Sequence, residues 1–281
     1  MLCDRQGARC ITLPGWGALL VSTDLHGNYE DFRVLRDRYR ARRRAERDVC
    51  WLILGDAIHG PDEEARRRDP ALYDFEDRSR EIIAEICAMV AAEPDHVFFL
   101  LGNHEHAHVG GARTRKFHTD EAAHLEAQLD AAAVERLRSF CRAAPLIAVA
   151  PCGLVFCHGS PGAELESLEQ LLGLDYDEAK LDDEQRQLLR SLLNSYGQGS
   201  AVTAKVLDGL RRSTGFELSL MIHGHDRDEA GWFAEGGNQL CPVIFGAPRD
   251  KKRYLELDLG ARYRSLESIR EGLELRLLHH Q

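Results

Sequence analysis

Short apolar runs recur along the chain, separated by longer segments in which polar and apolar residues are mixed. Apolar runs of about 4–8 residues predict buried strands, because helices need longer periodic segments. The predicted strands are Ala18–Thr23, Val49–Leu54, His96–Leu101, Leu146–Val149, Leu154–Cys157, Leu218–Ile222, Val243–Phe245 and Tyr254–Leu259. Since apolar residues in most of these runs are continuous and do not alternate with polar residues, we expect both faces of the strands to be covered by helices or by a second sheet.

The longer segments carry apolar residues at helical spacing. The predicted helices are Tyr29–Arg44, Asp74–Ala92, Thr119–Arg142, Glu184–Asn194 and Ala201–Arg212. The polar stretches Pro61–Pro70 and Asp175–Glu184 are interpreted as exposed loops or frayed helices. Strands that alternate with helices predict a layered α/β fold. No repeat or linker divides the sequence, so we expect residues 1–281 to form one domain.

Composition and charge narrow the possible partners. With 36 Lys and Arg against 46 Asp and Glu, the net charge of −10 makes long nucleic acid an unfavourable partner. No segment approaches the roughly 18 apolar residues that a membrane helix needs, and no leader pattern is visible. We therefore expect a cytoplasmic protein without a membrane partner. The eight cysteines contain no C-x-x-C pair and are expected to be reduced thiols.

Residues of metal-ligand type follow five of the predicted strands, in the segments TDLHGN, LGDAIHG, LGNHE, FCHGS and LMIHGH. Because sites in α/β sheets form where the carboxyl ends of strands and their loops converge, we expect these side chains to meet. The residues are Asp24, His26, Asp56, Asn103, His104, His158 and His225. Each motif alone is ordinary turn chemistry, and the interpretation depends on all of them together.

The donor set indicates which metal ions are suitable. Carboxylate, amide and imidazole ligands together suit Mn²⁺, Fe, Zn²⁺ or Co²⁺, and are too rich in imidazole for Ca²⁺ or Mg²⁺ alone. The set has no Cys, which argues against a closed structural zinc site. His223 precedes the last glycine and is interpreted as a packed or supporting histidine, and His106 and His108 are interpreted as loop residues.

The ordered motifs D-x-H, G-D, G-N-H-[DE], H-G and G-H resemble those of the calcineurin-like metallophosphoesterases. Two longer stretches, Phe140–Ser160 and Gln239–Pro248, are similar to segments of the phosphoprotein phosphatase branch, so the likeness runs from about Leu19 to Leu259. The resemblance implies a central β-sandwich flanked by helices. It also implies a dimetal site at the carboxyl edge of the strands.

The resemblance also implies roles for single residues. Asp24 and His26 would bind the first of two divalent metal ions, and Asp56 would bridge both. The implied ligands of the second metal are Asn103, His158 and His225. Mn²⁺ is the expected metal. A metal-bridging hydroxide would attack phosphorus in line, and His104 would protonate the departing oxygen.

The sequence departs from the family pattern at three places. Protein phosphatases carry G-D-x-x-D-R-G where this chain has GDAIHG, so His59 stands where the acidic partner of the catalytic histidine is expected. The phosphate-binding Arg of that motif is missing, although a transferring phosphoryl group needs positive charge on its oxygens. Arg249 and Asp250 replace the Asn-Tyr of S-A-P-N-Y, and Arg227 replaces the last His of G-H-x-H. The candidates for the missing cation are Arg249 and Arg227, with Arg113 and Arg115 behind them.

These features predict a metal-dependent phosphomonoesterase similar to protein Ser/Thr phosphatases, acting on a phosphoprotein or a small phosphoester. The alternative is a nucleotide-directed hydrolase for a dinucleoside polyphosphate or a cyclic phosphodiester, which the altered GDAIHG loop favours. A third reading is a non-catalytic metal-binding or scaffold protein. The complete ligand set together with His104 argues against it. The oligomeric state stays open at this point.

Overall fold

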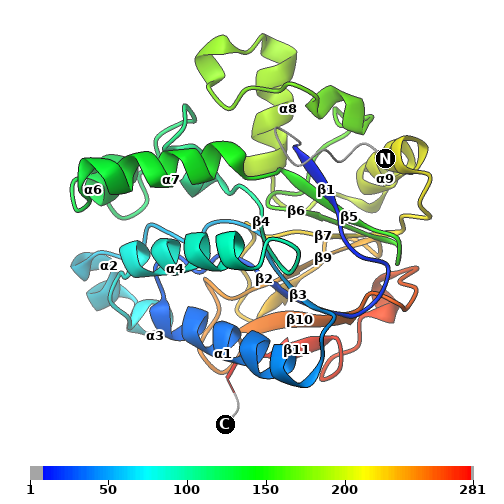
Figure 1. The fold of residues 1–281 in the computed structure, drawn as a ribbon, viewed down its shortest axis with the longest axis horizontal. Coiled ribbons are helices and arrows are strands. Elements are labelled where there is room, and N and C mark those ends of the chain that lie inside the picture. The colour runs from blue at the N-terminus through cyan, green and yellow to red at the C-terminus, as the bar shows by residue number, and fades with distance from the viewer. Residues whose placement is uncertain (1–8, 280–281) are drawn as a thin grey trace.

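The computed structural model describes residues 9–279, which form two β-sheets packed against each other and covered by helices (Figure 1). The six-stranded sheet runs in the order β1 (Cys10–Thr12), β5 (Ile147–Ala150), β6 (Leu154–Cys157), β7 (Leu220–Ile222), β9 (Gln239–Pro242) and β8 (Trp232–Phe233). The five-stranded sheet runs in the order β11 (Leu275–Leu277), β10 (Arg253–Asp258), β2 (Ala18–Ser22), β3 (Val49–Ile53) and β4 (Val97–Phe99). The predicted sandwich is confirmed.

Each sheet contains a run of three parallel strands, although β2 and β6 also pair antiparallel with β10 and β5. In one sheet β2 pairs with β3 and β3 with β4, with Ala18 opposite Val49 and Trp51 opposite Val97. In the other sheet β6 pairs with β7 and β7 with β9. The carboxyl ends of β2, β3 and β4 therefore lie at one edge of their sheet, and those of β6, β7 and β9 at one edge of theirs.

Alternate residues of each strand face two different apolar layers. Leu19 and Val21 pack with Phe156 between the two sheets, whereas Leu20 and Trp51 belong to the layer under the helices. Side chains alternate across a strand, so a strand covered on both sides needs apolar residues at every position. This double burial explains the continuous apolar runs.

Helices cover the outer faces of both sheets (Figure 1). Helices α1 (Tyr29–Ala45) and α4 (Ser79–Ala92) lie side by side against β3 and β4, and α9 (Ser200–Thr214) packs on β7. The other helices are α2 (Glu63–Arg68), α3 (Pro70–Tyr73), α5 (Asn103–His106), α6 (Glu121–Glu126), α7 (Ala131–Ala143), α8 (Asp183–Asn194), and the 3-10 turns η1 (Leu168–Leu171), η2 (Glu178–Lys180) and η3 (Leu266–Ser268).

Several predicted boundaries are wrong for local reasons. The predicted strand Val243–Phe245 is a turn, and the strand is the preceding segment, β9. The predicted helix Thr119–Arg142 is divided into α6 and α7, because the Asp130 side chain accepts from Ala133 N–H and starts a new helix. In the same way Asp62 caps α2 inside the polar stretch Pro61–Pro70.

Other differences concern elements too short to leave a pattern. The strands β1, β8 and β11 have two or three residues and were not predicted. Helix α4 begins at Ser79, later than expected.

Within residues 9–279 no helix is long and apolar enough to cross a membrane. Among the thiols, Cys50, Cys87, Cys141, Cys152, Cys157 and Cys241 form no disulfide, and Cys3 lies outside the described residues.

Candidate metal centre

The backbone is strained at five residues that all lie beyond strand ends. Asp24, His26, Asp56, His59 and His225 have φ angles of 37°, 41°, 52°, 66° and 69°. No other non-glycine residue between 9 and 279 has a positive φ. Residues with a side chain rarely adopt this left-handed conformation, and such strain persists mainly at functional sites where the surrounding structure enforces it.

Hydrogen bonds hold the loops after the strands together. The His26 N–H donates to the Asp56 carbonyl at 3.0 Å, which joins the loops after β2 and β3. The His225 N–H donates to a carboxylate oxygen of Asp24 at 3.0 Å, and the His158 carbonyl accepts from the loop after β7 at 2.7 Å. Loops from both sheets thereby meet at one edge.

The Asp56 carboxylate lies at the centre of this edge. Its Oδ2 is 3.4 Å from His158 Nε2, 3.7 Å from His26 Nε2 and 3.9 Å from His104 Nε2. Its Oδ1 accepts a hydrogen bond from the His104 N–H at 2.9 Å. One carboxylate oxygen therefore faces three imidazole nitrogens.

These donors form two groups that share Asp56. The first contains His26, Asp56 and His104, and the second contains Asp56, His158 and His225, each with donor atoms within 4.8 Å of one another. A carboxylate common to two N/O donor groups fits a bridging role between two ions. The side chains of this chain therefore fit a dimetal centre.

The two remaining predicted ligands lie at the margins of these groups. The Asn103 side-chain oxygen is 3.0 Å from His158 Nε2, and Asp24 Oδ1 is 3.9 Å from His26 Nε2. All six predicted metal ligands are thus brought to one edge of the sandwich. His104 lies there as well.

The electrostatics of the edge indicate a shortage of positive charge. Burial opposes ionisation of Asp56, but the imidazoles of His158 and His104 hold its pKa well below the usual range. Burial disfavours the charged form of His158, but Asp56 raises its pKa to about 10. Burial raises the pKa of Asp24 to about 7, against the influence of His158 and with a further contribution from the Asp56 charge. Divalent cations would stabilise both carboxylates in their charged form.

Glu105 is a buried acid that the sequence analysis did not single out. Its carboxylate accepts hydrogen bonds from the Asp56 N–H at 2.8 Å and the Ala57 N–H at 2.9 Å. Burial, and then the Asp56 charge, raise the pKa of Glu105 to about 8. The carboxylate fixes the strained Asp56 loop. The only signal in the sequence is the last position of the G-N-H-[DE] motif.

His104 is buried among titratable side chains. Its Nδ1 lies 2.9 Å from His59 Nδ1 and 3.6 Å from Glu121 Oε2. The Glu121 Oε1 accepts from the Phe117 N–H at 3.0 Å, whereas Oε2 has no hydrogen-bond partner. Glu121 begins α6 and belongs to no recognised motif, so sequence reasoning missed it. An acid is therefore present behind His104 although His59 occupies the position where one was expected.

The contacts of His59 continue toward the surface. Its Nε2 is 3.1 Å from His108 Nε2, and His108 Nδ1 is 2.9 Å from Glu126. Glu126 pairs with Arg138 at 2.7 Å. His106 and His108 were predicted to be loop residues, but both are buried and His106 ends α5, so the prediction is wrong for His106.

His223 is fully buried and does not face Asp56 in either donor group. Its Nδ1 is 3.0 Å from the Gly224 carbonyl and 3.4 Å from Asp226 Oδ2, and Cys241 completes this separate group. Burial lowers the pKa of His223 to about 4. Its Nε2 is buried and has no hydrogen-bond partner, so the interpretation of His223 as a packed histidine stays a prediction.

The four predicted cations have different surroundings. The Arg249 guanidinium makes two hydrogen bonds to the Glu30 carboxylate, at 2.7 and 2.8 Å, and its side chain is 58% exposed. Arg113 lies 3.7 Å from Asp120, and Arg115 is exposed. Arg227 is exposed as well, and its guanidinium carbon lies 5.5 Å from the centre of the Phe245 ring.

A further cation, Lys116, lies on the same aromatic ring and was not predicted. Its Nζ is 3.9 Å from the centre of the Phe245 ring, which is 4.1 Å from the centre of the His26 ring. Burial, and then the Arg227 charge, lower the pKa of Lys116 to about 7, against the attraction of Asp56 and Asp24. Lys116 therefore belongs to the charged surroundings of the centre.

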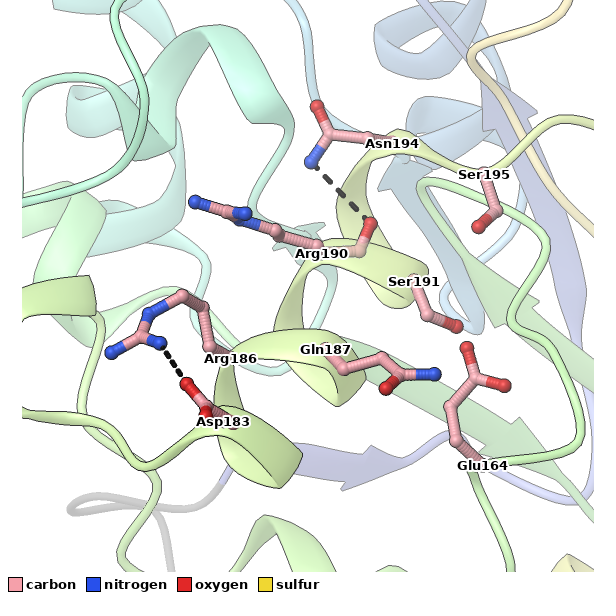
Figure 2. A pocket seen from close by; sticks show the side chains of 8 residues that line it. All are labelled: Glu164, Asp183, Arg186, Gln187, Arg190, Ser191, Asn194 and Ser195. Carbon is pink, nitrogen blue, oxygen red and sulfur yellow. Dashed lines mark hydrogen bonds and ion pairs between the residues drawn. The ribbon is translucent and has the colours of Figure 1, made fainter.

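A separate hollow of about 420 Å³ lies along α8 (Figure 2). Its lining side chains are polar, and none of the predicted site residues is among them. The lining residues are Glu164, Asp183, Arg186, Gln187, Arg190, Ser191, Asn194 and Ser195.

The chain is similar to known proteins in its family motifs and in its fold. The family model of the calcineurin-like phosphoesterases matches residues 18–227, whereas no curated protein matches the chain. A protein serine/threonine phosphatase from Saccharomyces cerevisiae is 14% identical with a TM-score of 0.61, and the match covers 90% of this chain and 77% of that one. A cold-active protein-tyrosine phosphatase of a Shewanella species is 15% identical with a TM-score of 0.54, covering 92% and 84%.

At these identities the two structures show that the fold is shared. The family match spans the segments from β2 to Arg227, which include every residue of the two donor groups. This chain therefore belongs to the calcineurin-like phosphoesterase family and is a metallophosphoesterase, a hydrolase of phosphoric ester bonds.

Proposed function

We propose that this protein is a phosphomonoesterase similar to protein Ser/Thr phosphatases, that it works with two divalent ions, and that Mn²⁺ is its preferred metal. The observation that carries the proposal is the convergence of three imidazole nitrogens on one oxygen of the bridging candidate Asp56, within 3.4–3.9 Å. A cytoplasmic location and a phosphoprotein or small phosphoester as substrate are part of the same proposal.

Six side chains would hold the ions. They are Asp24, His26, Asp56, Asn103, His158 and His225. When bound, the ions would lower the pKa of a water molecule and withdraw charge from the phosphoryl oxygens. The chain itself contributes the fixed positions of the ligands, because the strained loops are joined to one another by hydrogen bonds.

His104 is the proposed proton donor to the departing oxygen. Its Nε2 faces the centre, 3.9 Å from Asp56, and its Nδ1 faces Glu121 and His59. We assign to Glu121 the orienting role of the acid that the GDAIHG loop lacks, because its unpaired Oε2 points to His104. A carboxylate in this place stabilises the imidazolium that donates the proton.

The test of the proposal is the metal dependence of aryl phosphate hydrolysis. Chelation should abolish activity, and Mn²⁺ or a similar transition metal should restore it. Full activity after exhaustive removal of metal would contradict the proposal.

A nucleotide-directed hydrolase is the second candidate, and Tyr196 favours it. This ring is 62% exposed and its centre lies 5.0 Å from that of His225, so a nucleobase has an aromatic surface on which to stack beside the centre. A parallel assay with a phosphopeptide, a dinucleoside tetraphosphate and a cyclic phosphodiester, each with Mn²⁺, separates the two. Preference for a nucleotide that is lost in Tyr196→Ala would establish the second candidate.

A further inference from the structure

The family position for a phosphate-binding arginine has no room for a side chain in this chain. The residue after His59 is Gly60, and a Cβ placed there would lie 2.8 Å from the Asp77 carboxylate and 2.8 Å from the His26 carbonyl. A larger residue would collide with backbone that holds a predicted metal ligand. The cation that binds phosphate must therefore come from another segment.

Lys116 is the one lysine of this chain that is both partly buried and without a carboxylate partner within residues 9–279. The sequence has five lysines, all within the described residues, and only Lys116 and Lys252 are not exposed. Lys252 pairs with Asp31. Within residues 9–279 no carboxylate lies within 4.0 Å of the Lys116 ammonium. A partly buried ammonium without a counter-ion is unfavourable, and a bound anion would remove that cost.

One aromatic ring lies between Lys116 and the predicted metal ligand His26. The ammonium rests on Phe245, whose ring packs on His26. The Lys116 Nζ is 3.9 Å from the centre of the Phe245 ring, and that centre is 4.1 Å from the centre of the His26 ring. The cation is thus close enough to act on the same groups that would surround a substrate phosphate.

Aromatic side chains hold Lys116 and Arg227 in place. Phe245 is 4% exposed and stacks on Tyr73 with ring centres 5.3 Å apart, and Phe117 packs on its edge at 6.1 Å. Arg227 approaches the same Phe245 ring and makes no ion pair with a described carboxylate. The ring face attracts both cations without neutralising them. Burial lowers the pKa of Lys116 to about 7, and a bound anion would stabilise its charged form.

We infer that Lys116, assisted by Arg227, binds the terminal oxygens of a phosphomonoester and replaces the arginine that the GDAIHG loop lacks. The inference rests on the proposed function. A phosphomonoester carries roughly two negative charges at neutral pH, whereas a diester carries one. Two added cations beside the metal ions therefore favour the monoester, which identifies the substrate class of the site.

The experiment compares Lys116→Met with the matched control Lys205→Met in the full chain loaded with Mn²⁺. Lys205 is an exposed lysine on α9. The probe is inorganic phosphate as a competitive inhibitor of phenyl phosphate hydrolysis. Loss of one charge-assisted contact should raise the inhibition constant about tenfold or more in Lys116→Met. Metal content should be unchanged, and Lys205→Met should match the wild type.

Two further measurements complete the test. Lys116→Met should lose more kcat/KM on phenyl phosphate than on bis-p-nitrophenyl phosphate, and Lys116→Arg should keep most of the phosphate affinity. An unchanged inhibition constant in Lys116→Met, or equal losses on monoester and diester, would overturn the inference. If Arg249→Met raises the constant instead, the cation is Arg249 and the inference is wrong.

Failure of the proposed function has a different signature. In that case the wild-type chain with Mn²⁺ hydrolyses no phosphoester. Calorimetry can still measure the affinity of the wild type and of Lys116→Met for inorganic phosphate. Weaker phosphate binding in the variant would support the Lys116 site without the activity. Equal phosphate affinity in the wild type and in Lys116→Met would overturn the inference.

Discussion

Two polar regions of this molecule use their charged side chains in opposite ways. At the strand edge, Asp56 is 1% exposed, and its Oδ2 lies 3.4–3.9 Å from three imidazole nitrogens. In the hollow along α8, two arginines are paired with carboxylates, Arg186 with the fully exposed Asp183 at 2.6 Å (Figure 2) and Arg190 with Glu178 at 2.5 Å. The two arginines of the hollow are therefore already neutralised, whereas the buried carboxylate and imidazoles of the edge fit a metal ion.

The two regions also differ in how they are built. The strand edge is assembled by loops from both sheets, and five of its residues have left-handed backbones that hydrogen bonds across loops enforce. The hollow is lined mainly by one helix, with Glu164 from a neighbouring loop, and α8 forms without strain from its Asp182 cap. Strain of this kind is retained where a precise arrangement of side chains is needed. The same substitution should therefore have a larger effect on activity at the strand edge than in the hollow.

The largest difference is expected between Asp56→Asn and Asp183→Asn, the same substitution at the edge and in the hollow. Asp56→Asn removes the charge that the two donor groups share, so metal content should fall. Residues that only orient a metal ligand typically contribute up to about 100-fold, and kcat should drop by more than that. Asp183 is fully exposed and its variant should behave as wild type. Metal analysis and steady-state rates provide the measurement. Equal metal content in both variants would argue against Asp56 as the bridge.

A smaller effect is expected for His104→Asn, which should keep both metals. A positioned acid contributes about 10²–10⁴-fold, so the rate on an alkyl phosphate should fall by that factor. The loss should be smaller on p-nitrophenyl phosphate, because nitrophenolate leaves without a proton. Parallel rates on the two substrates give the measurement. If metal is lost, or if both substrates lose rate equally, His104 is not the general acid.

Glu121→Gln should act through His104 and therefore have a weaker effect. Partners that orient an active-site imidazole typically contribute about 10–100-fold, and we expect a loss in this range on the alkyl phosphate. As with His104, the loss should be smaller on the nitrophenyl ester, which distinguishes orientation of an acid from general damage. Glu135→Gln, at an exposed position of α7, is the matched control. An effect independent of the leaving group would give Glu121 a purely structural role.

The sequence and the structure agree where chemistry follows a strand directly. Asp24, His26 and Asp56 could be predicted because strand ends and their loops gather at a sheet edge. The continuous apolar runs predicted strands covered on both faces, and the two-sheet sandwich came from the family resemblance. Lys116 and Glu121 could not be predicted in this way. They lie in the segment from Gly111 to Glu126, which carries no periodic pattern before α6 and reaches the site only through tertiary packing on Phe245 and His104.

The smallest effect is expected in the hollow, for Arg190→Ala. The Arg190 side chain is 55% exposed and its pair with Glu178 is solvent-screened, so its loss should change the free energy of unfolding by about 1 kcal/mol or less. Since Arg190 lines the hollow and contacts no residue of the strand edge, kcat/KM and metal content should equal those of the wild type. Thermal unfolding, the phenyl phosphate assay and metal analysis measure these three quantities. A substantial loss of kcat/KM with unchanged stability would mean that the hollow takes part in substrate binding. The two regions would then differ in role, with the hollow binding the substrate and the strand edge carrying out catalysis.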